Sequence, residues 1–495
     1  MTAPSDMKNA AVALNRFGLG VRPDEALPAD PKAWLLAQAE HYEALPPAWA
    51  GQPPSASLVM GYVDYQRELR QADAGSELAL RQKLRSQSQE RYRSAVNARV
   101  ESALSTPAPF AERLVHFWAN HFAVSVDKTP IAALAGAFEV EAIRPHVFGR
   151  FEDMLLAVEH HPAMLFYLDQ VRSIGPGSAL GLRAARANPA RQRGLNENLA
   201  REILELHTLG VRSGYSQEDV TELARALTGW SIAGLPGLPN PTIPVPASIP
   251  TPVRASTPIP VHAELVEARP TRQQQQGAFA FLPLLHEPGP RNVLGRRYDQ
   301  QGEAQASAIL QDLASAPATA RHIAGKLARH FAGDTPPAAL VDRLAETFMR
   351  SRGDLPSVYR TLIDSPEVWT SAQSKFKTPW EWTLSSLRGL RLRELRGQQL
   401  APALVQLGQP AWRPGSPAGY DDIAASWLAP DALMRRVEFA QRFAAQAGST
   451  VDARVLGPQL LPGGLSEATA STVARAESPA TALALLLASP EFLRR

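Results

Sequence analysis

Residues 196–210 read NENLAREILELHTLG and residues 216–228 read SQEDVTELARALT, and these two segments decide the fold assignment. Apolar residues recur every three or four positions in both, as in amphipathic helices. Gly210 has the residue type that ends a helix. Ser216 and Asp219 have the spacing of a capping box that begins the next helix. The stretch therefore predicts a helical hairpin over about 197–209 and 217–228.

The same 3.6-residue period extends through most of the chain, whereas alternating β-branched runs are few. Phe279–Phe281, the turn at 286–289 and residues 293–295 indicate one short β-excursion. We therefore predict a mainly α, large multi-helical domain of helical hairpins packed around one core. The other expected helices cover about 31–41, 56–73, 76–105, 109–122, 130–142, 150–160, 163–169, 301–314, 318–331, 336–351, 355–364, 379–391, 431–446 and 479–488.

A proline-rich and glutamine-rich segment at about 231–275 interrupts this pattern. Each proline removes a backbone donor and clashes with the preceding helical turn, so no packed helix is expected there. We predict a disordered insertion. It would separate an N-terminal helical part, residues 1–230, from a C-terminal helical part, residues 276–495, and the two parts are expected to pack as one continuous domain.

The composition excludes several classes of protein. The chain has 495 residues, 45% of them apolar, which is enough for a large core. Cysteine is absent, which excludes disulfides, thiolate metal ligands and cysteine nucleophiles. No phosphate loop, dinucleotide glycine fingerprint or Gly-x-Ser-x-Gly elbow occurs in a strand-to-helix setting. Nucleotide and serine-hydrolase chemistry are therefore not expected.

The charge pattern bears on partners and location. Net charge is only +3, and the basic residues of 81–99 alternate with glutamates, so no nucleic acid partner is expected. No apolar run reaches the roughly 18 residues of a membrane span. The first residues lack the apolar core of a secretory signal. We expect a cytoplasmic protein as written, or a periplasmic one where a signal has been removed.

The first candidate site is the polar side of the hairpin. A helical wheel places Asn198, Arg201, Glu202 and Glu205 together, away from the apolar face. These four residues are the predicted catalytic group. The alternative is a surface role, in which Arg201 and Glu205 form an i,i+4 ion pair worth about 0.3–0.5 kcal/mol.

The segment HFWANH, residues 116–121, carries two histidines that do not share a face. Five residues advance a helix by roughly 500°, which leaves the two imidazoles about 140° apart. We expect His116 on a polar face with Arg113 and Asn120, and His121 as a hydrogen-bonded core residue.

A metal site is possible where several helices each contribute a donor. The predicted ligands are His116, Glu205 and His286, with Glu202 beside them, a nitrogen and oxygen set suited to zinc, iron or manganese. The cofactor, if any, would thus be a divalent metal.

Several motifs resemble one family. They are the Asn-Glu-Asn-x-Ala-Arg-Glu string at 196–202, HFWANH at 116–121, NRFGLG at 15–20, KFKTPWE at 375–381, Gly415 to Asp421, WLAP at 427–430 and SPEF at 489–492. Together they resemble the bacterial domain of unknown function 1800 family, across almost the whole chain. At 286–287 this family usually has His-Asp, whereas the chain has His286-Glu287, which lengthens the carboxylate arm.

This resemblance implies no established activity. Members of the family are often encoded beside the domain of unknown function 1501 family, which looks like alkaline phosphatases and sulfatases. Two hypotheses follow. The first is a metal-dependent enzyme in which Glu202 or Glu205 is a ligand or base, His116 and His286 are ligands or acids, and Arg201 binds an anionic group. The second is a non-catalytic partner or maturation factor of the sulfatase-like protein.

Overall fold

The computed structural model describes residues 4–187, 194–239, 276–370, 375–395, 399–448 and 451–495. Helices dominate these residues, and the two small antiparallel sheets have two strands each. The prediction of a mainly α-helical chain with a short β-excursion is confirmed. Most of the predicted insertion, residues 240–275, lies outside the described residues. No described helix has the length and apolar character needed to cross a membrane.

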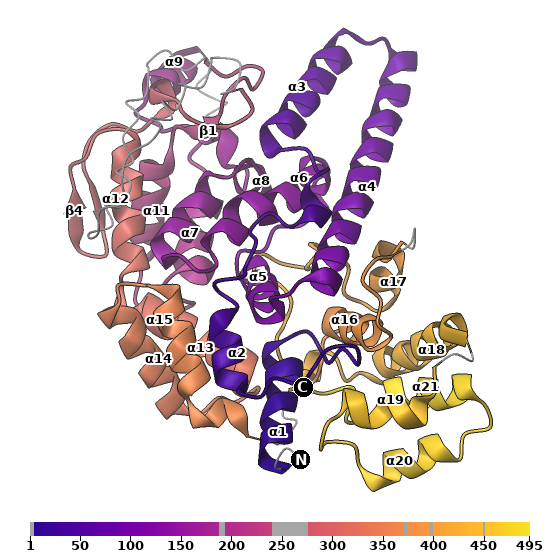
Figure 1. Ribbon diagram of the computed structural model, residues 1–495. Coiled ribbons are helices and arrows are strands. Elements are labelled where there is room, and N and C mark those ends of the chain that lie inside the picture. The colour runs from indigo at the N-terminus through magenta and orange to yellow at the C-terminus, as the bar shows by residue number, and fades with distance from the viewer. Residues whose placement is uncertain (1–3, 188–193, 240–275, 371–374, 396–398, 449–450) are drawn as a thin grey trace, which may run out of the picture.

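The first part of the chain folds into eleven α-helices among the described residues, and Figure 1 shows α3 and α4 as a long hairpin projecting from the body. The bounds are α1 (Pro4–Val12), α2 (Pro31–Ala37), α3 (Ser55–Gln71), α4 (Ala74–Ser105), α5 (Pro109–His121), α6 (Thr129–Phe138), α7 (Phe151–His160), α8 (Pro162–Tyr167), α9 (Ala179–Ala187), α10 (Asn198–Glu202) and α11 (Gln217–Leu227). Three π-helical turns extend neighbouring helices: η1 (Ala13–Phe17), η3 (Glu139–Ile143) and η6 (Ile203–His207).

The second part continues with helices that return to the N-terminal segments. Their bounds are α12 (Glu303–Ala314), α13 (Pro317–Ala332), α14 (Ala338–Arg350), α15 (Leu355–Asp364), α16 (Pro379–Gly389), α17 (Ala401–Gln406), α18 (Pro430–Ala447), α19 (Ala453–Leu460), α20 (Glu467–Ala474) and α21 (Pro479–Leu487). Short 3₁₀ turns occur at η2 (Pro47–Trp49), η4 (Arg144–His146), η5 (Gln170–Arg172), η7 (Pro283–Leu285), η8 (Pro366–Trp369) and η9 (Ala424–Ser426). Across the whole described chain, the periodicity did not predict α1, α9, α17, α19 and α20.

The β-excursion consists of two ribbons. Strand β1 (Trp230–Ile232) pairs antiparallel with β2 (Phe279–Phe281), and β3 (Arg291–Val293) pairs with β4 (Arg296–Tyr298). The sequence predicted that the proline-rich break begins at about residue 231, which is wrong at its first residues. Residues 230–232 form a strand because their side chains are buried and their backbone pairs with β2.

One apolar core includes residues from both sides of the 240–275 gap. The Phe17 ring lies 5.1 Å from that of Phe331 and 5.3 Å from that of Trp369, measured between ring centroids. Trp118 Nε1 donates a hydrogen bond of 2.7 Å to the hydroxyl of Tyr359. The N-terminal turn η1, α5, α13 and α15 therefore share packing, while the domain boundaries at 230 and 275 stay predictions.

The helical hairpin that decides the fold assignment is present. Ser216 Oγ accepts from the Asp219 amide at 3.2 Å, and Asp219 Oδ2 accepts from the Ser216 amide at 2.7 Å, which confirms the capping box. Gly210 has φ +97°, a left-handed conformation that favours glycine. The first helix differs from the prediction in its last turn, because residues 203–207 widen into the π-helical turn η6.

Replacing Ser216 with alanine should lower the free energy of unfolding by about 1 kcal/mol, because the first amides of α11 lose their side-chain acceptor. Urea denaturation of both proteins measures the difference. The matched control is Ser86→Ala, since Ser86 is an exposed residue in the middle of α4 and caps nothing. Equal stability of the Ser216 variant and the parent protein would show that the box contributes nothing.

Candidate functional site

A cavity of about 220 Å³ lies between α5, α13, α16 and the segment 409–422. It exceeds the ~150 Å³ of an engineered cavity that admits benzene, so a small organic molecule fits. Its charged and imidazole lining comes from Arg99, Arg113, His116, Lys326, Arg329, His330, Glu381, Asp421 and Asp422. Titratable groups gathered in a concave site are the usual signature of a binding or catalytic centre.

Helix α5 supplies one wall through the polar face that the sequence predicted. Arg113, His116 and Asn120 recur at helical spacing, and all three line the cavity. His121 lies on another side of the helix, where it is 1% exposed and its Nε2 is 3.2 Å from the carbonyl oxygen of His207. The prediction that His116 and His121 serve different surroundings is confirmed.

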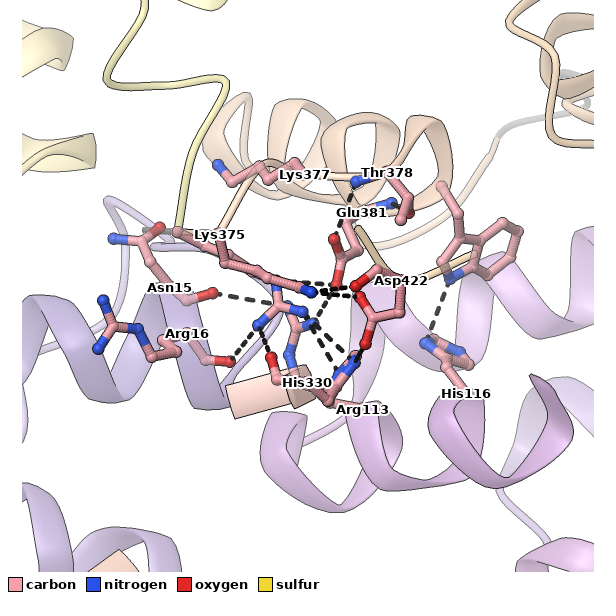
Figure 2. Close-up of polar contacts among 12 residues, drawn as sticks. Asn15, Arg16, Arg113, His116, His330, Lys375, Lys377, Thr378, Glu381 and Asp422 are labelled. Atoms are coloured by element: carbon pink, nitrogen blue, oxygen red, sulfur yellow. Dashed lines mark hydrogen bonds and ion pairs between the residues drawn. The ribbon is translucent and has the colours of Figure 1, made fainter. Parts of the chain in front are cut away.

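Two carboxylates of the lining are each held by two cationic or imidazole groups (Figure 2). Glu381 Oε1 contacts the Arg113 guanidinium and lies 2.9 Å from Arg495 Nε. Asp422 Oδ2 accepts from His330 Nδ1 at 2.7 Å, and its Oδ1 is 3.0 Å from Lys375 Nζ.

These partners fix the charge of both carboxylates. Burial raises the pKa of Glu381, but Arg495 and Arg113 outweigh it and hold the pKa well below its usual range. Burial likewise opposes ionisation of Asp422, yet His330 and Lys375 keep its pKa low. Both groups are therefore anions that the protein itself pairs with cationic or imidazole groups.

His116 is a neutral ring on the cavity wall. Its Nδ1 accepts from Trp380 Nε1 at 3.2 Å, which places the ring proton on Nε2. Burial, and then the nearby guanidinium groups of Arg99 and Arg144, lower the pKa of His116 well below its ordinary value.

An aromatic and cationic wall lies beside this histidine. The Arg99 guanidinium carbon is 4.6 Å from the Trp380 ring centroid and 5.0 Å from that of Trp412. Arg99 Nε lies 2.8 Å from Glu139 Oε2, and Trp412 Nε1 donates to the same oxygen at 3.2 Å. Cation–π contacts and the shared carboxylate thus fix the position of this wall.

The segment 409–422 is fastened to α5 by one amide. Asn120 Nδ2 donates to the Tyr420 carbonyl at 2.8 Å, and Asn120 Oδ1 accepts from the Tyr420 amide at 2.7 Å. The neighbouring Gly419 has φ +81°, and a Cβ there would lie 2.3 Å from the Asn120 carbonyl oxygen. Glycine is therefore required for this close approach.

Lys326 differs from the other cations of the cavity. Its Nζ lies 3.0 Å from Nδ1 of His121, and within the described residues it makes no other hydrogen bond and no ion pair. Burial lowers the pKa of Lys326 to about 8, the positive charge of Arg329 contributes to the decrease, and Asp422 opposes it. Roughly one Lys326 amine in ten is therefore neutral at pH 7.

The predicted catalytic group of the hairpin lies outside the cavity lining. Asn198 is exposed. Arg201 is 39% exposed, and it lies 2.8 Å from Gln217 Oε1 and 3.5 Å from Glu205 Oε1. Burial raises the pKa of Glu202. The arrangement of Arg201 and Glu205 is the surface ion pair that the sequence left open as the alternative.

The predicted metal ligands do not converge. Among the described residues, no group of three or more His, Cys, Asp or Glu side chains could hold a metal ion. His116 faces the cavity, and Glu205 pairs with Arg201 on the hairpin. His286 Nδ1 lies 2.9 Å from the Thr228 carbonyl oxygen. The expectation that His116, Glu205 and His286 form one site is thus corrected, because each has separate neighbours.

Next to His286, Glu287 Oε2 accepts from the Gly177 amide at 2.6 Å.

The sequence missed the residues of α13. The sequence patterns singled out neither His330 nor Lys326. A usable signal was the rarity of lysine in this arginine-rich chain: lysine occurs at positions 8, 32, 83, 128, 326, 375 and 377. The KFKTPWE motif did contain Lys375, Trp380 and Glu381, although their role could not be inferred from it.

Fold and cavity together define a mainly α-helical protein with a partly open, cation-rich cavity. The chain matches the family model described as "Protein of unknown function (DUF1800)" over residues 12–494, and it belongs to that family. Comparison with curated proteins and with solved structures found no match.

Lys377 should destabilise the protein at neutral pH. Its Nζ has no hydrogen-bond partner within the described residues and lies 4.2 Å from the Phe492 ring centroid. Burial lowers the pKa of Lys377 to about 7. The unfolded chain therefore binds more protons than the folded one between pH 7 and 10, so this residue makes stability rise with pH.

Lys377→Met should raise the free energy of unfolding at pH 7 by about 1 kcal/mol or more, because the unpaired amine is removed. The gain should shrink between pH 7 and pH 9 in urea denaturation. Lys83→Met, at an exposed position of α4, is the control. A gain that does not change with pH would contradict the buried-amine explanation.

Metal analysis tests whether His116, Glu205 and His286 bind a metal ion together. Alanine at His116, at Glu205 or at His286 should leave the metal content of the purified, untagged protein equal to that of the wild type. Elemental mass spectrometry gives this measurement. A near-stoichiometric metal that is lost in all three folded variants would restore the predicted site.

Proposed function

We propose that this protein is an enzyme, that its active site between helices is the cavity bounded by α5, α13 and α16, and that its substrate is a small anionic molecule. The observation that carries the proposal is the amine of Lys326. Lys326 is one of the residues that line the cavity, its Nζ is 3.0 Å from an imidazole nitrogen of His121, and no carboxylate among the described residues forms an ion pair with it.

The charge of the lining favours an anion. Glu381 and Asp422 are each already paired with cationic or imidazole groups of the protein, and the charge of Asp422 also favours the ammonium form of Lys326. Lys326 and Arg329, one helical turn apart on α13, have no ion-pair partner among the described residues, and of the two Arg329 is exposed to solvent. A carboxylate or phosphate would supply the missing counter-charge.

The amine can also transfer protons. A group whose pKa is near the working pH has large populations of both its acid and its base form, which is the requirement for general acid–base catalysis. Lys326, with a pKa of about 8, meets it. This acid–base role of Lys326 involves no metal ion.

A ligand panel tests the proposal. Small carboxylates and phosphates should raise the thermal midpoint of the wild type, whereas their neutral amides should not. Lys326→Gln should weaken binding at least about tenfold in titration calorimetry, the loss of roughly 1.4 kcal/mol expected for one charged contact. Lys83→Gln is the matched control.

The same measurements distinguish the proposed enzyme from a non-catalytic partner protein. A non-catalytic partner of a sulfatase-like protein would copurify with that protein in the wild type and in Lys326→Gln alike, and no small anion would stabilise it. That combination of results would overturn the enzyme proposal.

A further inference from the structure

We propose that Lys326 is an amine nucleophile that forms an imine with a small anionic carbonyl compound, with His121 as its base. This inference rests on the proposed function, because it takes the cavity as the active site. It adds the reaction class and the chemical class of the substrate: an oxo acid or an anionic aldehyde.

The geometry matches that of an activated nucleophile. Such a nucleophile lies within hydrogen-bond reach of a base, and a third group orients the base. Lys326 Nζ is 3.0 Å from His121 Nδ1, and His121 Nε2 is 3.2 Å from the carbonyl oxygen of His207. Because Nε2 must donate to that carbonyl, Nδ1 has a free lone pair directed at the amine.

The π-helical turn η6 supplies the orienting carbonyl. The last carbonyls of a helix lack helical partners, and here side chains take their place. The backbone carbonyl of His207 accepts from His121 Nε2, and the Leu206 carbonyl lies 3.1 Å from His322 Nε2. His207 is itself fixed, because its Nδ1 donates to buried Glu159 Oε1 at 2.7 Å. The hairpin motif thus acts as a positioning element for the base.

Imine formation requires a neutral amine, and Lys326 has a neutral fraction at neutral pH. Its lowered pKa leaves roughly one amine in ten neutral at pH 7. Lys375 differs because it forms ion pairs with Asp334, at 2.9 Å, and with Asp422. Lys377 is not part of the cavity lining.

The step balances without a further reactant. The lone pair of the neutral amine attacks the carbonyl carbon, a C–N bond forms, and the π electrons move to the oxygen. His121 Nδ1 takes a proton from the nitrogen and returns it to the oxygen, which gives a carbinolamine. Loss of the hydroxyl as water, with a second proton from the nitrogen, leaves the imine. Arg329 offers the positive charge for the carboxylate of the substrate.

Borohydride trapping tests the inference directly. The full chain is incubated with glyoxylate or pyruvate, reduced, digested and mapped by mass spectrometry. We expect a reduced adduct on Lys326 at least about tenfold faster than on Lys83, an exposed lysine that serves as the internal control.

Two variants separate the roles. Lys326→Arg keeps the cation and should bind the probes but form no adduct at this position. His121→Phe keeps a ring in the core and should slow trapping at least about tenfold, because the base is lost. If His121→Phe does not fold, the labelling rate of Lys326 relative to Lys83 in the wild type decides the test.

The outcomes distinguish the two proposals. Binding of the probes to the wild type without an adduct on Lys326, or labelling of Lys326 no faster than of Lys83, overturns the imine and leaves the cavity as a binding site. Absence of both binding and adduct with either probe overturns the imine, and failure of the wider anion panel is what overturns the proposed function.

Discussion

The buried ion network of Arg113, Glu381 and Arg495 joins the segments that build the cavity. Arg113 Nε donates to the Gly18 carbonyl at 2.6 Å, and Arg495 Nη1 donates to the His330 carbonyl at 3.0 Å. Glu381 stands between the two guanidinium groups and also caps α16. A carboxylate held in this way is costly to leave unpaired, by about 3–5 kcal/mol. The relative positions of η1, α5, α13 and α16 therefore depend on it.

The cavity beside this network is lined by two kinds of charged group. Glu381 and Asp422 are each paired with cationic or imidazole groups of the protein. Lys326, by contrast, has only an imidazole among its described hydrogen-bond partners. Matched charges stabilise a fixed scaffold, whereas an unmatched amine retains the capacity to react or to bind. This asymmetry argues for a reactive site.

Local patterns predicted much of the fold but only part of the site. The capping box at Ser216 and the polar face of α5 depend on residues a few positions apart, so periodicity and spacing reveal them. Lys326 and His121 are 205 positions apart in the chain, and their contact exists only in the tertiary structure. The turn η6 also escaped prediction, because a wheel drawn for a regular α-helix cannot anticipate a π-helical turn. The sequence therefore suggested a catalytic role for the acidic side chains of the hairpin. In the structure, the hairpin reaches His121 and His322 through the backbone carbonyls of His207 and Leu206.

The short ribbon of β1 and β2 has a consequence for how the gene can change. Ser231 faces Ala280 across the pair, so two points nearly fifty positions apart in the sequence are neighbours in space. The chain between them therefore starts and finishes at neighbouring points of the fold. Doubling the length of such a closed loop costs only about 0.6 kcal/mol of chain entropy. Added residues in this stretch would therefore cost little stability as long as β1 and β2 stay paired.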